Sequence, residues 1–261
     1  MKQLFITFLT VILILMSADA QDIDNVKYAV CHKIYEEINI DGHFTESAWQ
    51  HAEWIDDFED IRGGGISNHK TQAKILWSND FLYLAIKFEE PHICAYITEN
   101  EQQIYFDNAF ELFIDPDDDA RNYYEFEINA VGATWDLQMN KPYSEGGNFN
   151  SNWNICNLQK AIFLNGTLNN PTDVDSFWTI ELAIPFSAFD EYANGKHPCD
   201  GAKWKLNLLR VQWNFDIVDG KYIKKTDEKG KLLRSDFWVW SPQKQINMHI
   251  PERWGILEFK D

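Results

Sequence analysis

The densest acidic cluster of the chain is the run Asp115-Pro116-Asp117-Asp118-Asp119, which directly follows a predicted strand. The carboxylates of Asp115, Asp117 and Asp119 alternate as in a calcium loop, and clustered carboxylate oxygens are the ligands that the hard Ca²⁺ ion prefers. Ala120 stands where such a loop has glycine, and no matching glutamate follows it. The run therefore predicts either a structural calcium site or a solvated acidic turn.

Three glutamates, Glu111, Glu125 and Glu127, lie on two neighbouring predicted strands. Two carboxylates at the right separation could act as the acid and the nucleophile or base of a glycoside hydrolase. They could equally accept hydrogen bonds from sugar hydroxyls or solvate one face of a sheet. Because the chain has 41 acidic residues, such neighbours arise readily by chance. The glutamates alone therefore leave a catalytic and a binding role open.

Aromatic side chains are abundant, at 15% of the chain with 11 Trp, 10 Tyr and 18 Phe. Rings inside apolar runs, such as Trp77 and Trp178, are predicted to fill a core. Rings among polar residues can instead stack on the C–H face of a sugar while nearby polar groups bind its hydroxyls. The candidate sugar-binding residues are Tyr105, Glu111, Glu127, Asn129, Trp135, Arg210 and Trp213.

The sequence gives less support to nucleophilic catalysis, zinc catalysis or haem binding. The sequence contains neither a G-x-S-x-G elbow nor an H-E-x-x-H zinc motif. Met248-His249 lies in a predicted loop and could supply haem ligands, although a loop methionine and a solvated histidine are an equally simple interpretation. The four cysteines are far apart in sequence, which leaves both disulfides and buried free thiols open.

The N-terminus is typical of a secretory signal peptide. Lys2 precedes an apolar stretch from Leu4 to Met16, and Ala18-Asp19-Ala20 fits a cleavage site, so residues 1–20 are predicted to be removed. The apolar stretch is shorter than the roughly 20 residues of a membrane span, and no later segment is long and apolar enough to be one. We therefore expect a secreted, periplasmic or cell-surface protein. Its net charge of −18 argues against nucleic-acid partners and anionic membrane surfaces.

The elements that must hold these residues are mostly strands. Short β-branched and aromatic runs alternate with turn signals, among them Asp219-Gly220 in a two-residue hairpin. Predicted strands cover 73–77, 81–88, 109–114, 123–129, 134–139, 158–164, 177–184, 204–213 and 255–259. Short helices are expected at Thr45–Ala52 and Pro185–Tyr192. This pattern predicts an all-β fold, an antiparallel, jelly-roll-like β-sandwich with one or two short helices.

The strand 123–129 alternates with period two. Tyr124, Phe126 and Ile128 share one face, and Glu125 and Glu127 lie on the other. Such alternation predicts a sheet with one face in the core and the other face polar.

An ordered set of motifs resembles carbohydrate-binding module family 9. The set comprises Ile40-Asp41-Gly42 with Glu46, Trp49 and Ala52, then 76–85, 107–116, 123–136, 178–185, 204–210, Trp240-Ser241-Pro242 and Pro251 with Trp254-Gly255. Together these motifs divide the chain into a signal peptide (1–20), a lead-in strand (21–37) and a family-9-like domain (38–261). The resemblance implies a β-sandwich that binds oligo- or polysaccharide and contains structural calcium.

In that family two tryptophans clamp a terminal sugar and polar side chains assist them. By motif the helpers fall at Glu111 and Asn129. The first clamp position falls near Ile104 or Tyr105 and the second near Met248, and no tryptophan stands at either. Glu127 occupies the place of an expected arginine. The resemblance implies a secreted, non-catalytic protein accessory to xylan- or cellulose-type degradation that works alongside secreted glycoside hydrolases. The alternatives are glycoside hydrolase activity and a haem- or redox-cofactor-binding sandwich of the related dopamine-monooxygenase-N-terminal-like type.

Overall fold

The computed structural model describes residues 26–193 and 197–261. The predicted signal peptide (1–20) lies outside this part and stays a prediction. The strands are β1 (Tyr28–Lys33), β2 (Glu59–Asp60), β3 (Thr71–Trp77), β4 (Phe81–Glu89), β5 (Ala109–Asp115), β6 (Tyr123–Asn129), β7 (Thr134–Met139), β8 (Phe149–Asn150), β9 (Gln159–Asn165), β10 (Phe177–Pro185), β11 (Lys203–Gln212), β12 (Phe215–Val218), β13 (Lys221–Lys224), β14 (Asp236–Val239) and β15 (Gly255–Lys260). The helical elements are α2 (Ser47–His51) and the 3₁₀ turns η1 (Ile104–Phe106), η2 (Tyr143–Glu145), η3 (Phe186–Phe189) and η4 (Pro251–Arg253).

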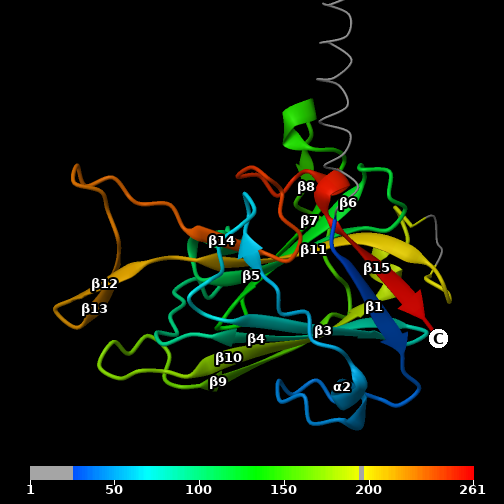
Figure 1. Cartoon of the computed structure of the whole chain (residues 1–261), viewed down its shortest axis with the longest axis horizontal. Helices are drawn as coiled ribbons and strands as arrows, with labels where there is room; N and C mark the ends of the chain where they lie inside the picture. The colour runs from blue at the N-terminus through cyan, green and yellow to red at the C-terminus, as the bar shows by residue number, and fades with distance from the viewer. Residues whose placement is uncertain (1–25, 194–196) are drawn as a thin grey trace, which may run out of the picture.

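Two layers of strands face each other, which confirms the all-β sandwich (Figure 1). One layer has the order β8-β7-β6-β5-β11 and the other has β3-β4-β10-β9, with β15 and β1 pairing between them at one side. Most neighbours are antiparallel, but β1 runs parallel to both β15 and β3. The predicted antiparallel sandwich therefore includes one parallel strand, β1, which belongs to the predicted lead-in (21–37) and pairs between the two layers.

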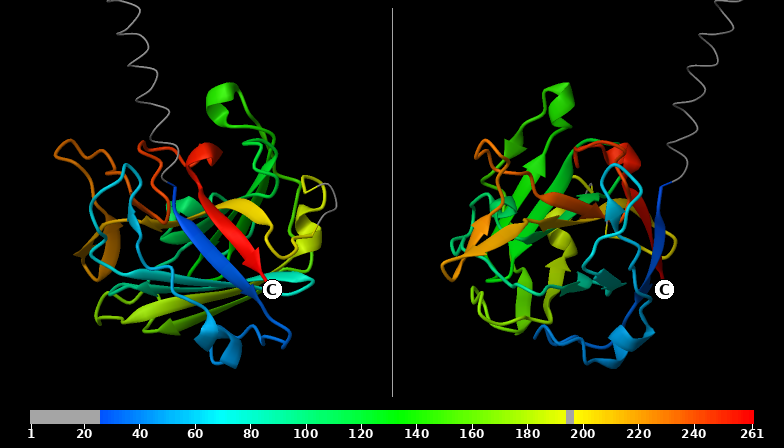
Figure 2. Two further views of the ribbon diagram at one scale, coloured as in Figure 1. Left: turned by 45° about the vertical axis from the view of Figure 1, so that its right-hand side comes forward. Right: turned by 60° about the vertical axis from the view of Figure 1, so that its left-hand side comes forward.

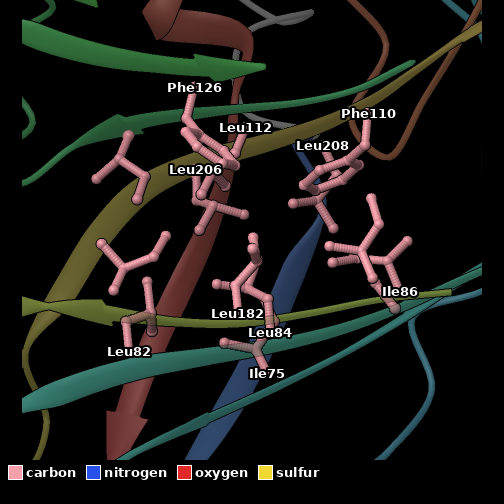
Figure 3. Close-up of a cluster of buried hydrophobic side chains, with 14 of the residues drawn as sticks. Ile75, Leu82, Leu84, Ile86, Phe110, Leu112, Phe126, Leu182, Leu206 and Leu208 are labelled. Atoms are coloured by element: carbon pink, nitrogen blue, oxygen red, sulfur yellow. The ribbon is translucent and has the colours of Figure 1, made fainter. Parts of the chain in front are cut away.

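The core lies between the layers, where the inward faces of several strands meet (Figure 3). The side chains labelled there are all buried: Ile75, Leu82, Leu84, Ile86, Phe110, Leu112, Phe126, Leu182, Leu206 and Leu208. Alternate residues of β5 and β6 point into this core, as period-two patterning predicts. The intervening residues of the same strands therefore point to the opposite face.

That opposite face carries the predicted polar side chains of β6, but they are largely buried. Glu125 is 6% exposed and Glu127 is 1% exposed. A second apolar cluster packs on this side of the sheet and includes Phe113, Tyr123 and Trp254. The alternation of β6 thus separates two buried environments, one apolar and one mixed, rather than a core and a solvated face.

The helical predictions are correct in place but too long. The segment Thr45–Ala52 contains only the five-residue α2, and Pro185–Tyr192 contains the 3₁₀ turn η3. Trp49 of α2 is buried on the outer face of the β3-β4-β10 layer. None of the helices in the described residues is long and apolar enough to cross a membrane.

Local turn chemistry explains two further features. The hairpin between β12 and β13 turns at Asp219 and Gly220, both with positive φ, as the sequence predicts. It projects beyond the layers, as does the segment that carries η2 (Figure 2). All four cysteines are free thiols, with Cys31 and Cys94 buried and Cys156 and Cys199 exposed.

Candidate functional site

A cleft of about 360 Å³ opens on the face of β5, β6 and β7 that points away from the core. Its floor carries Glu111 from β5 together with Glu125 and Glu127 from β6. Glu111 is paired directly opposite Glu127 in the β-ladder, and Phe113 is paired opposite Glu125. Period-two geometry therefore brings the three carboxylates to one face, where one oxygen from each lies within 4.8 Å of the others.

The floor carboxylates differ in their hydrogen bonding. The backbone N–H of Tyr105 donates to Glu127 Oε2 over 2.8 Å. Oε2 of Glu125 is buried and has no hydrogen-bond partner among the described residues. The imidazole Nε2 of His249 lies 3.9 Å from this oxygen, which is too far for a hydrogen bond. The other ring nitrogen, Nδ1, lies 2.9 Å from the Tyr123 hydroxyl.

Burial dominates the electrostatics of this floor. Loss of solvent raises the pKa of Glu125 to about 8, and burial followed by repulsion from neighbouring carboxylates raises the pKa of Glu111 and of Glu127. Burial lowers the pKa of His249 to about 4, so its ring is neutral at pH 7. The floor is therefore a concentration of acidic groups without a compensating charge from that histidine.

Aromatic rings form the walls. Tyr105 comes from η1 and Trp135 from β7, with ring centroids 6.2 Å apart. Phe149 of β8 lies 6.1 Å from Trp135 and is nearly perpendicular to it, and Tyr143 of η2 packs edge-on to His249. Tyr143 and Phe149 are each 44% exposed. The rim can therefore offer ring faces to a ligand while the floor offers hydrogen-bond acceptors.

Four of the seven predicted sugar-binding residues meet in this cleft: Tyr105, Glu111, Glu127 and Trp135. Met248, at the second clamp position implied by the family resemblance, also lines the cleft, close to the first position at Tyr105. The two positions therefore converge although neither is tryptophan. Only Tyr105 among them can present a ring face.

The other three predicted residues do not line the cleft. Asn129 is fully buried, and its side chain donates to Ile97 O and Asp107 Oδ2 while accepting from the turn after β6. Arg210 points into the core side, where it forms a 3.0 Å ion pair with Glu90. Trp213 is buried and donates its indole N–H to Tyr105 O. All three are structural contacts here, although Trp213 supports the segment that carries Tyr105.

Several cleft residues lie outside the predicted sugar-binding set: Glu125, Tyr143, Phe149 and His249. Glu125 shares the β6 face of Glu127, so the alternation of that strand already contained the signal. Tyr143 and Phe149 lie between β7 and β9 in a mostly irregular segment that has no periodicity to indicate their direction. His249 of the proposed haem pair has its ring against Phe113, Tyr123 and Tyr143.

The predicted calcium ligands Asp115, Asp117 and Asp119 also converge, with one oxygen from each within 4.8 Å of the others. Asp115 is fully buried and accepts hydrogen bonds from the N–H groups of Asp118 and Ala120, so it caps its own turn. Ala120 has φ +60°, the left-handed conformation for which a calcium loop uses glycine. These contacts suit an acidic turn and a cation site equally, and calcium here stays a prediction.

The comparisons with known proteins agree with this architecture. A family model described as carbohydrate family 9 binding domain-like matches residues 40–261. A Bacteroides uniformis protein inferred to bind carbohydrate is similar in structure, with a TM-score of 0.66 and 19% identity over 90% of this chain and all of that one. No curated protein matches the chain.

Two structures of a family 9 carbohydrate-binding module from Caldicellulosiruptor kristjanssonii are also similar. The complex with cellotriose has a TM-score of 0.53 and 14% identity, covering 89% of this chain and 94% of the module. The complex with glucose has a TM-score of 0.52 and 14% identity, covering 89% and 96%. At these identities the structures support the fold, and the family model covers most of the sequence. The chain therefore belongs to the carbohydrate family 9 binding domain-like family.

Proposed function

We propose that this protein binds carbohydrate without cleaving it, in the cleft above Glu111, Glu125 and Glu127. The observation that carries the proposal is the aromatic rim of Tyr105, Trp135 and Phe149 around a floor of hydrogen-bond acceptors. Rings of this kind stack on the apolar face of a sugar, and carboxylates accept hydrogen bonds from its hydroxyls. Family membership and the position of the cleft at both implied clamp positions support the same function.

Glucose- and xylose-containing glycans are the first ligands to test. The similar Caldicellulosiruptor kristjanssonii module is in complex with cellotriose in one structure and with glucose in another. Isothermal titration with glucose, xylose and cello- and xylo-oligosaccharides should show saturable heat. The Trp135→Ala variant should bind more weakly, whereas Trp54→Ala, which removes a partly exposed ring outside the cleft, should not. The absence of binding to every glycan in a broad array contradicts the proposal.

A hydrolytic role is the second candidate, because Glu125 has the raised pKa of a general acid. Glycosidases place two carboxylates on opposite sides of the bond that they break. Here the three glutamates project from two adjacent strands and form one floor, so a sugar in the cleft lies on one side of all of them. This arrangement favours binding. Reducing-sugar release that disappears in Glu125→Gln would favour hydrolysis instead.

We further propose that the protein acts outside the cytoplasm as an accessory to secreted glycoside hydrolases that degrade xylan- or cellulose-type polysaccharides. The N-terminal apolar stretch with its Ala18-Asp19-Ala20 site supports export. N-terminal sequencing of the protein from its native host should begin at Gln21. Addition of the purified protein to a secreted xylanase or cellulase should raise sugar release from insoluble substrate, and the Trp135→Ala variant should not.

A further inference from the structure

The floor of the cleft brings together three buried carboxyl groups that face no Lys or Arg side chain among the described cleft residues. Glu111, Glu125 and Glu127 are 5%, 6% and 1% exposed. The basic side chain that lines the cleft with them, His249, has its Nε2 3.9 Å from Glu125 Oε2, which is beyond hydrogen-bond reach. Buried carboxylates are normally paired with a cation or fully hydrogen-bonded. A cation bound at the floor would therefore supply a partner that the described cleft residues do not.

We propose that Glu111, Glu125 and Glu127 bind one divalent cation of the Ca²⁺ class at the floor of the cleft, and that two hydroxyls of the bound sugar complete its coordination. The second half of this proposal rests on the proposed carbohydrate-binding function, and the first half does not. The cation would join the acidic floor and the aromatic rim into one binding site.

The geometry of the three carboxylates fits a single ion. One oxygen from each lies within 4.8 Å of the other two. Three oxygens 4.8 Å apart lie about 2.8 Å from their common centre, close to the 2.3–2.6 Å of Ca²⁺–oxygen bonds, so a small rotation of the side chains lets one ion contact all three. The ligands stand on the paired strands β5 and β6, where the ladder between Glu111 and Glu127 fixes their separation.

An unpartnered atom points to the same site independently. Glu125 is only 6% exposed and lines the cleft, yet its Oε2 accepts no hydrogen bond from any N–H or hydroxyl group of the described residues. Glu127, in contrast, has one oxygen held by the Tyr105 N–H. A cation between the carboxylates would satisfy the Glu125 oxygen without displacing the Tyr105 bond.

The chemistry of the donors selects the kind of ion. All three are carboxylate oxygens, which favour Ca²⁺, Mg²⁺ or Mn²⁺ over soft metals. Ca²⁺ takes 6–8 oxygen ligands in flexible geometry, so three glutamates leave positions open toward the cleft. Tyr105 and Trp135 flank that opening and would orient a sugar ring over the ion.

A protonated amino sugar is the competing ligand, because an ammonium group can donate hydrogen bonds to three carboxylates. The 1–6% exposure of the glutamates favours a bare ion, since an ammonium on a sugar ring must bring the ring down to the floor. Titration with each ligand in turn separates the two.

Calcium titration of the chelator-treated protein by calorimetry, without sugar, tests the cation site. We expect Glu111→Gln and Glu125→Gln each to weaken one Ca²⁺ site at least tenfold. The matched control is the double variant Asp117→Asn/Asp119→Asn, which alters the other acidic cluster and should retain this site. Because Gln keeps the shape of Glu and removes repulsion, both variants should melt in EDTA at or above the wild-type temperature, which shows that they fold.

Three results would overturn the cation site: no Ca²⁺ binding, unchanged binding in both Glu variants, or glucosamine binding in EDTA that these variants abolish. A preference for Zn²⁺ that is lost in His249→Gln would overturn the assignment to an oxygen-ligated ion.

The bridging role is tested by titrating sugar into the protein once with Ca²⁺ and once with EDTA. Equal sugar affinity in both refutes the bridging role and leaves carbohydrate binding intact, whereas Ca²⁺ binding without any sugar binding refutes the proposed function and leaves the cation site intact.

Discussion

The backbone N–H of Tyr105 donates a 2.8 Å hydrogen bond to Oε2 of Glu127, which ties the aromatic wall of the cleft to its acidic floor. The bond comes from the main chain, so it holds whatever side chain residue 105 carries. Trp213 reinforces the same segment by donating its indole N–H to Tyr105 O over 2.8 Å. The position of the Tyr105 ring is therefore set by the surrounding backbone. The side chain at position 105 can be substituted without displacing Glu127.

This separation makes Tyr105→Ala a specific probe of stacking. We expect sugar affinity to fall about fivefold, because an aromatic contact contributes about 1 kcal/mol. The thermal midpoint should change little, since the N–H to Glu127 remains. Calorimetry with the best glycan measures the affinity, and Tyr96→Ala, which removes a 55% exposed ring outside the cleft, is the control. Equal losses in the two variants would show that Tyr105 does not contact the ligand.

The strands and the convergence of Glu111 with Glu127 could be predicted from the sequence, because period-two patterns fix which side chains share a face. The pattern does not say what covers that face. The cover comes from η1, η2 and the loop at Asn247–His249, which are distant in sequence and irregular. The same alternation of polar and apolar residues therefore occurs whether the polar face is exposed to solvent or buried.

The position of Arg210 also could not be predicted from the sequence. A basic residue beside a predicted sugar-binding strand could donate hydrogen bonds to sugar hydroxyls. In β11, however, the side chain of Arg210 points to the core face. Its partner there, Glu90, is 120 positions away in sequence. Only the packing of β11 against the β3–β4 layer brings the two together, and no local pattern contains that information.

The Arg210–Glu90 pair should be important for stability and not for sugar binding. Arg210→Met leaves the 3% exposed Glu90 without its cation, and breaking a buried pair costs about 3–5 kcal/mol. Urea unfolding should show this loss, whereas Arg62→Met, which removes an exposed ion pair with Asp60, should cost far less. If the folded Arg210→Met protein loses sugar affinity, the arginine has a role in the site that its core position does not explain.

The family motif at Asp41-Gly42 is held by a buried carboxylate. Glu181 Oε2 accepts the backbone N–H groups of Asp41 and Gly42 at 2.9 and 2.8 Å, and Glu181 Oε1 accepts the Trp49 indole N–H at 2.8 Å. Gly42 has φ +86°, and a Cβ there would lie 3.1 Å from the Phe163 backbone nitrogen. The glycine is therefore required by both conformation and close approach.

Gly42→Ala and Gly64→Ala separate these two requirements. Gly64 has φ +79°, and a Cβ added there would meet nothing within 4 Å, so alanine at this position suffers only the backbone strain. We expect Gly42→Ala to lower the free energy of unfolding by about 1–3 kcal/mol more than Gly64→Ala. Urea unfolding of both variants measures the difference. Equal values would mean that Phe163 moves aside freely and that only φ constrains Gly42.

The pair Glu101 and Asp136 should make stability depend on pH. Burial, followed by the charge of Asp136, raises the pKa of Glu101 to about 7, and the pKa of Asp136 is also raised by burial. Lys160 faces both groups and opposes these shifts, and Asn100 and Thr134 are their polar neighbours. A carboxyl whose pKa is higher in the folded state retains its proton longer than in the unfolded chain, so stability falls as pH rises from about 4.5 to about 7.

Glu101→Gln should remove the part of this pH-dependent fall in stability that is due to Glu101. The melting temperature of the variant relative to wild type should therefore be nearly constant below pH 4.5, rise between about pH 4.5 and 7, and level off above. Because other buried carboxyls titrate in both proteins, the difference between variant and wild type is the quantity to follow. A flat difference would show that the Glu101 carboxyl is fully solvated and is not coupled to Asp136.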